Sequence, residues 1–175
     1  MTVPYARTPA QRAGDFANAR AWEEEVASWL PPHIARFDST EELDIYVPGA
    51  YIDCKEKIRK ISDRWPRPPG VEEWDLFIID ELSVRKALRH FPMSYFLIRD
   101  RQSGDRVLLA RVDEMAAVER SRVNRVGKGK WLVDLSNFKV LEDPKYELWP
   151  AITADQLGLP WKRSECQSIK EVPQV

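Results

Sequence analysis

The stretch from Leu43 to Lys57, LDIYVPGAYIDCKEK, restricts the fold more than any other part of the sequence. Two segments of alternating apolar and polar residues, 43–47 and 50–55, flank a Pro-Gly pair, which is the pattern of a β-hairpin. A symmetric turn centred on this pair places Asp44 opposite Asp53. A shift of one residue would turn both aspartates into the core, so the pattern supports this register. Because Pro-Gly is not a preferred two-residue hairpin turn, we expect a wider loop that keeps the register.

The two faces of this hairpin differ in chemistry, because side chains alternate across a strand. One face is apolar and suited to the core: Leu43, Ile45, Val47, Ala50, Ile52 and Cys54. The other face carries the two aspartates and Lys55, together with Tyr46 and Tyr51. Opposed carboxylates destabilise a sheet, or one of them holds a proton at a raised pKa, unless a cation offsets the repulsion. Magnesium prefers carboxylate oxygens, so the pattern predicts a metal site with Lys55 beside the metal-bound water and the attacked phosphate.

A helix is expected before the hairpin, from a capping box at Thr8 and Gln11 to the Pro31-Pro32 pair. Residues at alternating steps of three and four predict its core-facing stripe: Phe16, Ala19, Glu23, Val26 and Leu30. Glu23 is the exception in this stripe and is a candidate to complete the acidic cluster. Glu24 is its rival, since residues 23–25 are all glutamates, and a simple salt bridge is the alternative role.

The remaining pattern predicts an α/β fold, with a central mixed, largely antiparallel sheet flanked by helices. Further strands are expected at 74–79, 94–100, 106–112 and 130–135, with helices beginning near residues 56, 80 and 113. From Pro144 onward the prolines and sparse periodicity indicate an irregular arm. We therefore expect one domain over 1–143 and a C-terminal arm over 144–175 that packs on it or extends from it.

Composition narrows the class of protein. The chain of 175 residues suits one domain, and its formal net charge of −1 does not indicate any class of binding partner. Its two cysteines, Cys54 and Cys166, exclude a disulfide framework and a four-cysteine zinc site. With no signal peptide and no run long enough to span a bilayer, a cytoplasmic protein without a membrane or organic-cofactor partner is expected.

A local basic run is the candidate nucleic-acid contact. It comprises Arg120, Arg122, Arg125, Lys128 and Lys130, with Gly127 and Gly129 allowing a loop to follow a phosphate backbone. A solvated helix end and turn is the alternative interpretation. Lys57 shares the face of Lys55 and is predicted to contact phosphate as well.

Together these residues resemble the signature of the PD-(D/E)XK nuclease superfamily, which has a helix glutamate, a strand aspartate and (D/E)-x-K on the next strand. The matching positions, in order, are Glu23, Asp44 and Asp53-Cys54-Lys55, within about the first third of the chain. Leu43 stands where the family often has proline, and Asp53 stands where glutamate is commoner. The hairpin spacing is similar to that of phage and archaeal junction-resolving enzymes and of restriction endonucleases.

The resemblance implies a restriction-endonuclease-like fold and metal-assisted hydrolysis of DNA phosphodiesters. Asp44, Asp53 and the Cys54 carbonyl would bind Mg²⁺, with Mn²⁺ as a substitute. Lys55 would position or activate the hydrolytic water, and Glu23 would serve a second metal or orient the groups that bind the first one. We expect a structure-specific endonuclease acting on branched or recombination intermediates, with a role in DNA recombination or repair.

Several alternatives stay open. They are an exonuclease, an RNA-processing nuclease, and a catalytically silent DNA-binding or scaffolding protein of the same fold. A homodimer is a further hypothesis, because symmetric cutting of two strands needs two sites. A phage-encoded origin is also left open.

Overall fold

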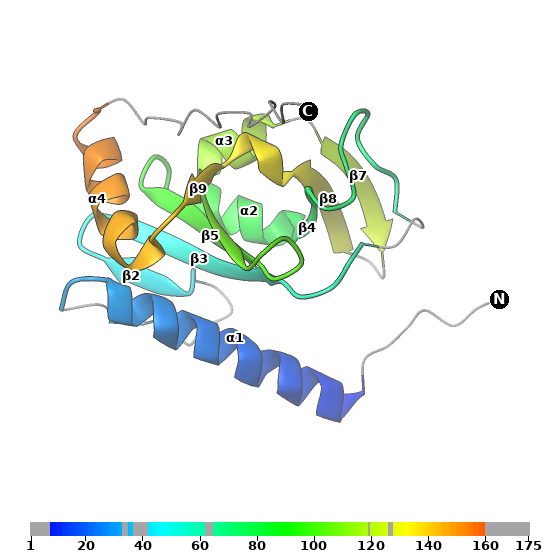
Figure 1. Ribbon diagram of the computed structural model, residues 1–175, viewed down its shortest axis with the longest axis horizontal. Coiled ribbons are helices and arrows are strands. Elements are labelled where there is room, and N and C mark those ends of the chain that lie inside the picture. The colour runs from blue at the N-terminus through cyan, green and yellow to red at the C-terminus, as the bar shows by residue number, and fades with distance from the viewer. Residues whose placement is uncertain are drawn as a thin grey trace, which may run out of the picture.

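The structure is a computed structural model that describes residues 8–32, 35–36, 42–61, 65–118, 120–125 and 128–159 (Figure 1). Its helices are α1 (Pro9–Trp29), α2 (Glu81–Leu88), α3 (Val112–Ala117), α4 (Pro144–Gln156) and the short 3₁₀ helix η1 (Leu135–Asn137). Its strands are β1 (Ala35–Arg36), β2 (Ile45–Val47), β3 (Ala50–Lys57), β4 (Leu76–Asp80), β5 (Ser94–Asp100), β6 (Arg106–Arg111), β7 (Arg120–Arg125), β8 (Lys128–Asp134) and β9 (Lys139–Leu141). No helix in these described ranges is long and apolar enough to cross a membrane.

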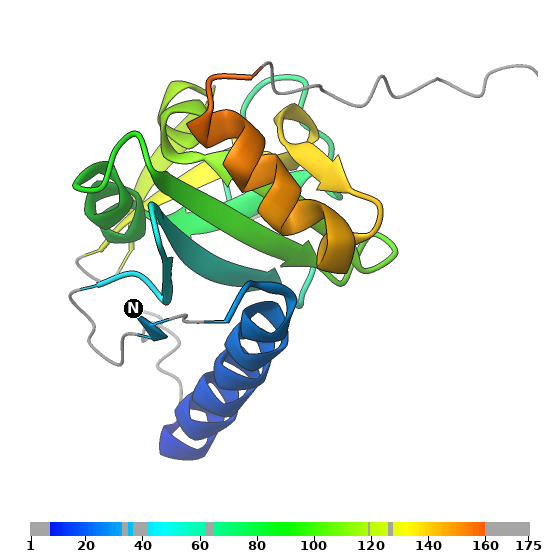
Figure 2. The ribbon, with the colours of Figure 1, turned by 90° about the vertical axis from the view of Figure 1, so that its left-hand side faces the viewer.

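The strands form a six-stranded sheet in the order β1-β2-β3-β5-β6-β9 and a three-stranded sheet in the order β4-β8-β7. In the larger sheet β3 and β5 are parallel, and the other neighbouring strands are antiparallel. Helices lie on both faces of the larger sheet, and α4 crosses one of them (Figure 2). The prediction of a mixed, largely antiparallel central sheet flanked by helices is therefore confirmed.

Two apolar clusters hold these layers together. One lies between the large sheet and helices α1 and α4, and includes Trp22, Ile52 and Ile152. The other lies on the opposite face, where α2, α3 and the small sheet pack, and includes Phe77 and Phe96. Burial on both faces explains why β5 reads as an almost continuous apolar run rather than an alternating one.

The hairpin of β2 and β3 has the predicted register, with Ile45 opposite Ile52 and Tyr46 opposite Tyr51. The expectation of a wider loop is wrong, because Val47 pairs directly with Ala50 across a two-residue turn. Proline fixes the first turn position, and Gly49 takes the second with a φ of 83°, a conformation that favours glycine.

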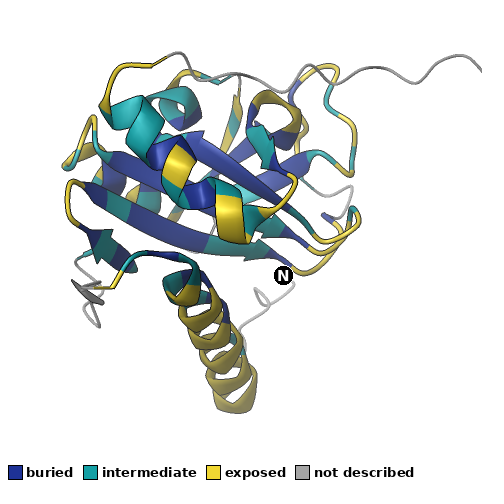
Figure 3. Cartoon of the chain, turned by 60° about the vertical axis from the view of Figure 1, so that its left-hand side comes forward, coloured by how far each residue is buried: buried dark blue, intermediate teal, exposed yellow. Residues whose placement is uncertain are grey.

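Helix α1 begins with the predicted capping box, in which Thr8 and Gln11 exchange hydrogen bonds. Its C-terminal part is anchored by Trp22 and Val26, whereas its N-terminal part projects from the body and is exposed (Figure 3). The prediction that Phe16 faces the core is wrong, because the residue is 75% exposed. The apolar stripe continues past the point where the helix leaves the sheet.

The prediction of an irregular arm from Pro144 is wrong over residues 144–156, which form α4. Leu148 and Ile152 of this helix are fully buried in the core. The predicted helix near residues 56–63 is also wrong, because β3 continues to Lys57 and residues 58–61 are not helical; residues 62–63 lie outside the described part. Residues 160–175 of the predicted arm lie outside it too.

Candidate active site

The predicted acidic hairpin residues converge on Lys55. Its Nζ lies 2.5 Å from Oδ1 of Asp53 and 3.7 Å from Oδ2 of Asp44. The same Nζ lies 3.4 Å from the carbonyl oxygen of Cys54. Each of the three groups that the resemblance assigns to a metal therefore places an oxygen atom near one ammonium group.

Asp44 is held in place by the backbone of the neighbouring strand. It lies one residue before β2, and its Oδ2 accepts a 2.7 Å hydrogen bond from the backbone N–H of Cys54. The residue before it, Leu43, is buried in the cluster on the α2 side rather than with Ile45, so its predicted face is wrong. Strict alternation ends where the chain enters the strand.

Asp53 is the electrostatically strained member of the site. The residue is 4% exposed, and its Oδ2 is buried without a hydrogen-bond partner among the described residues. Burial, opposed by Lys55 and reinforced by Asp44, raises the pKa of Asp53 to about 7. Burial alone would lower the pKa of Lys55, but the two carboxylates outweigh it and raise that pKa above its ordinary value. The lysine is thus a cation at neutral pH.

The donor set fits a hard cation that keeps much of its water. Within the described ranges, no three His, Cys, Asp or Glu side chains form a group able to hold a metal ion. The site offers two carboxylates and a carbonyl, and magnesium is commonly bound through one or two carboxylates plus waters and substrate phosphate. The unpartnered Oδ2 of Asp53 is consistent with such a ligand.

Asp44, Asp53 and Lys55 line a cavity of about 720 Å³ between α1 and α2, which we call the central cleft. From α1 it is lined by residues including Phe16, Arg20 and Glu23, and at α2 by Asp80, Ser83 and Lys86. Glu24 is exposed and pairs with Arg20 at 3.5 Å. Of the two rival glutamates, Glu23 is therefore the one that faces the cleft.

Sequence reasoning missed the contribution of α2 to this cleft. Asp80 ends β4, a strand of the other sheet, and Ser83 and Lys86 lie on the helix α2 that follows it. The strand and helix were both predicted, but nothing in their spacing indicates that they meet the β2–β3 hairpin. That proximity depends on how the two sheets pack.

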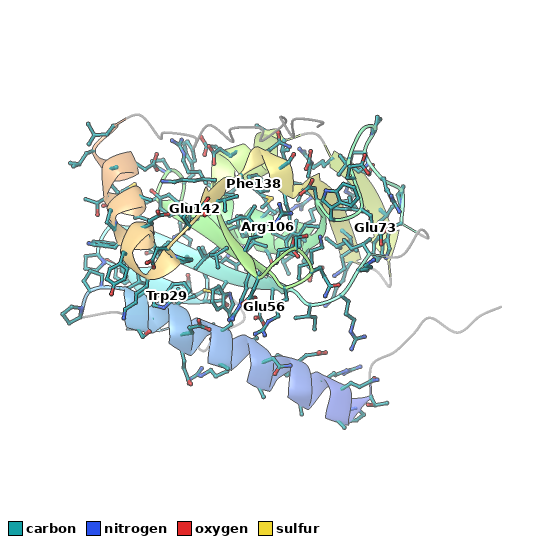
Figure 4. All side chains as sticks on the ribbon, in the orientation of Figure 1. Trp29, Glu56, Glu73, Arg106, Phe138 and Glu142 are labelled. Carbon is teal, nitrogen blue, oxygen red and sulfur yellow. The ribbon has the colours of Figure 1, made fainter. Side chains whose placement is uncertain are left out.

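Lys57 does not contact solvent as a phosphate-binding residue would, so this prediction is wrong. Its side chain is 3% exposed, lies 3.4 Å from Oδ2 of Asp100, and donates a hydrogen bond to the carbonyl of Trp74. Burial lowers the pKa of Lys57, although Asp100 opposes that shift. Arg106, labelled in Figure 4, also bonds Asp100 at 3.1 Å. Lys57 thus belongs to a structural ion cluster.

The predicted basic run forms the β7–β8 hairpin, and most of its described side chains have protein partners. Arg120 donates to the Ala116 carbonyl and lies over the ring of Trp131. Arg122 pairs with Glu81, and Lys130 pairs with Asp80. Lys128 is exposed, while Gly127 and the side chain of Arg125 lie outside the described part.

No protein-family model matches the sequence. No curated protein matches it either. Among solved structures, the chain is similar to Hjc, a Holliday junction resolvase from Archaeoglobus fulgidus, at 13% identity and a TM-score of 0.44 over 83% of this chain and 99% of that one. It is also similar to D212, a nuclease from a fusselovirus, at 11% identity and a TM-score of 0.44 over 88% of this chain and 99% of that one. At these values neither similarity carries a conclusion about the chemistry of this chain.

Proposed function

We propose that the chain is a metal-dependent DNA nuclease that hydrolyses phosphodiester bonds, and that it acts as a structure-specific endonuclease on branched or recombination intermediates. The observation that carries the proposal is the convergence of Asp53, Asp44 and the Cys54 carbonyl on Lys55 inside the central cleft. The resemblance of these positions to the PD-(D/E)XK signature supports the same chemistry.

In this proposal Asp44, Asp53 and the Cys54 carbonyl hold Mg²⁺, with Mn²⁺ as a substitute. When bound, the ion supplies a Lewis acid and lowers the pKa of bound water. Lys55 is an electrostatic group rather than a base, because the neighbouring carboxylates keep it protonated. Its ammonium would stabilise the negative charge that develops on the attacked phosphate.

Glu23 is proposed to orient the water that attacks the phosphate or to serve a second ion. It lines the central cleft together with Asp44 and Lys55, but approaches from the helix rather than from the sheet. A carboxylate in that place accepts hydrogen bonds from water without competing with Lys55 for the phosphate.

A homodimer is proposed as the active form on branched DNA. The cleft described here supplies one set of hydrolytic residues, and two symmetric incisions need two such sets. An exonuclease acting on a single strand would not need the second copy. Paired internal cuts would therefore indicate the dimeric endonuclease, and shortening from one strand end would indicate the exonuclease.

The rival from another class is a catalytically silent DNA-binding or scaffolding protein of the same fold, and the convergence of Asp44 and Asp53 on Lys55 speaks against it. The test offers four-way junction, flap, duplex and single-stranded DNA, and structured RNA, to the protein with Mg²⁺ or with chelator. We expect internal cleavage of a branched DNA that chelator abolishes. Binding without cleavage would support the silent protein instead.

Asp53→Asn is the decisive variant in that assay, and Glu142→Gln is its control, since Glu142 is an exposed carboxylate at the junction of β9 and α4 (Figure 4). Asp53→Asn should fold and bind DNA but cleave roughly 100-fold or more slowly. Cleavage at the wild-type rate by Asp53→Asn would remove the proposed site.

A further inference from the structure

A second cavity, of about 550 Å³, lies between α2 and the β7–β8 hairpin, and we call it the α2–hairpin groove. Its lining includes Ser83, Arg85 and Lys86 from α2, and Arg122, Lys128 and Gly129 from the hairpin. The proposed chemistry uses none of these residues.

The α2–hairpin groove continues from the central cleft. Asp80, Ser83 and Lys86 line both cavities. Ser83 and Lys86 are three residues apart on α2, a spacing that places them on neighbouring positions of one helix face. The two cavities are therefore neighbours along α2, and a DNA strand that leaves the central cleft along this helix reaches the groove next.

The groove has an excess of positive charge, with four cationic side chains and two carboxylates in its lining. Each carboxylate is already engaged. Glu81 accepts bonds from Arg122 at 2.8 Å and from Arg85 at 2.5 Å, and Asp80 pairs with Lys130. Because Glu81 offsets only one of its two arginines, the positive charge left over is that of one guanidinium together with Lys86 and Lys128.

Glu81 also fixes the two arginines without burying them. Its hydrogen bond from Arg122, assisted by that from Arg85, lowers the pKa of Glu81, so it stays ionised between them. The side chain of Arg85 is 69% exposed and that of Arg122 is 52% exposed. A guanidinium has more donors than one carboxylate oxygen uses, so both arginines can still bind an anion.

Gly129 lets the hairpin approach α2 closely enough to form this arrangement. A Cβ atom at this position would overlap the carboxylate of Glu81. A glycine at position 129 therefore leaves room for the Glu81 side chain. The close approach of the hairpin to α2 brings Lys128 to the same groove as Lys86.

We propose that the α2–hairpin groove binds the DNA backbone next to the scissile phosphate, with Lys86 and Lys128 as its main phosphate contacts. Fixed guanidinium groups and flexible lysines together suit phosphate oxygens. The inference rests on the proposed function, since it places the groove along the same DNA that enters the central cleft.

The test measures binding of a labelled four-way junction by fluorescence anisotropy in chelator, so that no cleavage occurs. The double variant K86A/K128A should bind at least about tenfold more weakly, and its plot of log affinity against log salt should flatten by about 1.8, at about 0.9 per phosphate contact. Lys145→Ala, which removes an exposed lysine from α4, should match the wild type. K86R/K128R should recover most of the affinity, because it restores the charge.

Equal affinity and an equal salt slope for K86A/K128A and the wild type would overturn the inference. So would a wild-type protein that does not bind the junction. A parallel cleavage assay separates the two proposals. If the variant loses binding while the wild type never cleaves, the groove is supported and the nuclease proposal fails. If the wild type cleaves but the variant binds normally, the groove alone is refuted.

Discussion

Lys55 and Asp53, two residues apart on β3, form a 2.5 Å ion pair in which the carboxylate is buried and the ammonium is partly exposed. The side chain of Asp53 is 5% exposed, against 27% for Lys55. The carboxylate is therefore almost wholly shielded from water at the floor of the central cleft, whereas the ammonium is partly open to it. This difference in exposure suits a site in which the buried Asp53 carboxylate binds a cation that enters from the cleft.

Replacing Lys55 tests its electrostatic role. Lys55→Met should slow DNA cleavage by roughly 100-fold or more, because it removes the cation beside the developing phosphate charge. Single-turnover cleavage of a junction measures this, with Lys60→Met as the control, since Lys60 is an exposed lysine after the same strand. A Lys55→Met protein that cleaves at the wild-type rate would show that the lysine is only structural.

Asp53 should make the metal-free protein less stable as pH rises. Its folded pKa of about 7 lies above the ordinary value of 3.8, so the folded state holds the proton more tightly than the unfolded state does. The resulting stability is fully present below about pH 4 and is lost as pH rises through about 7.

Asp53→Asn cannot ionise, so in chelator near pH 8 it should be more stable than the wild type, by on the order of 1 kcal/mol or more. The difference should shrink towards pH 5. Urea unfolding of both proteins across this range measures it. A variant that is less stable than the wild type at every pH would contradict the account of a strained carboxylate.

Lys57 should matter for stability and not for DNA contact. Lys57→Ala leaves Asp100 buried with Arg106 as its remaining ion-pair partner, and should cost about 2–4 kcal/mol of unfolding free energy. Chemical denaturation gives the cost, and the folded variant should bind DNA with the wild-type salt slope. A stable variant with weakened DNA binding would restore the original phosphate-contact prediction.

Helix α4 should behave as part of the core. Leu148→Ala should destabilise the protein by about 2–5 kcal/mol, the usual cost of truncating a buried leucine. Tyr146→Ala on the same helix should cost much less, because Tyr146 is 68% exposed. Equal effects in thermal unfolding would mean that residues 144–156 do not pack as described.

The sequence predicted what short-range rules control. The register of the β2–β3 hairpin followed from alternation and a turn, and the start of α1 followed from Thr8, Pro9 and Gln11, because these features depend on neighbouring residues. For the same reason, the approach of Asp53 to Lys55 could be predicted from their spacing on one strand, whereas Asp44 is held by the Cys54 backbone where the alternation ends.

Three of the misses have a different cause, which is long-range packing. The pattern of α1 does not show where the helix leaves the sheet, so Phe16 was placed in the core. The burial of Lys57 depends on Asp100, more than forty residues away. The contribution of α2 to the central cleft, through Ser83 and Lys86, depends on the packing of two sheets that no local pattern specifies.

The central claim is that Asp44 and Asp53 together bind a divalent cation beside Lys55. Calorimetric titration of chelator-treated protein with Mn²⁺ or Mg²⁺ tests it directly, comparing the wild type with Asp53→Asn and with Glu142→Gln. The account predicts saturable binding that Asp53→Asn abolishes and Glu142→Gln leaves unchanged. Binding of equal affinity in Asp53→Asn, or no binding by the wild type, would contradict it.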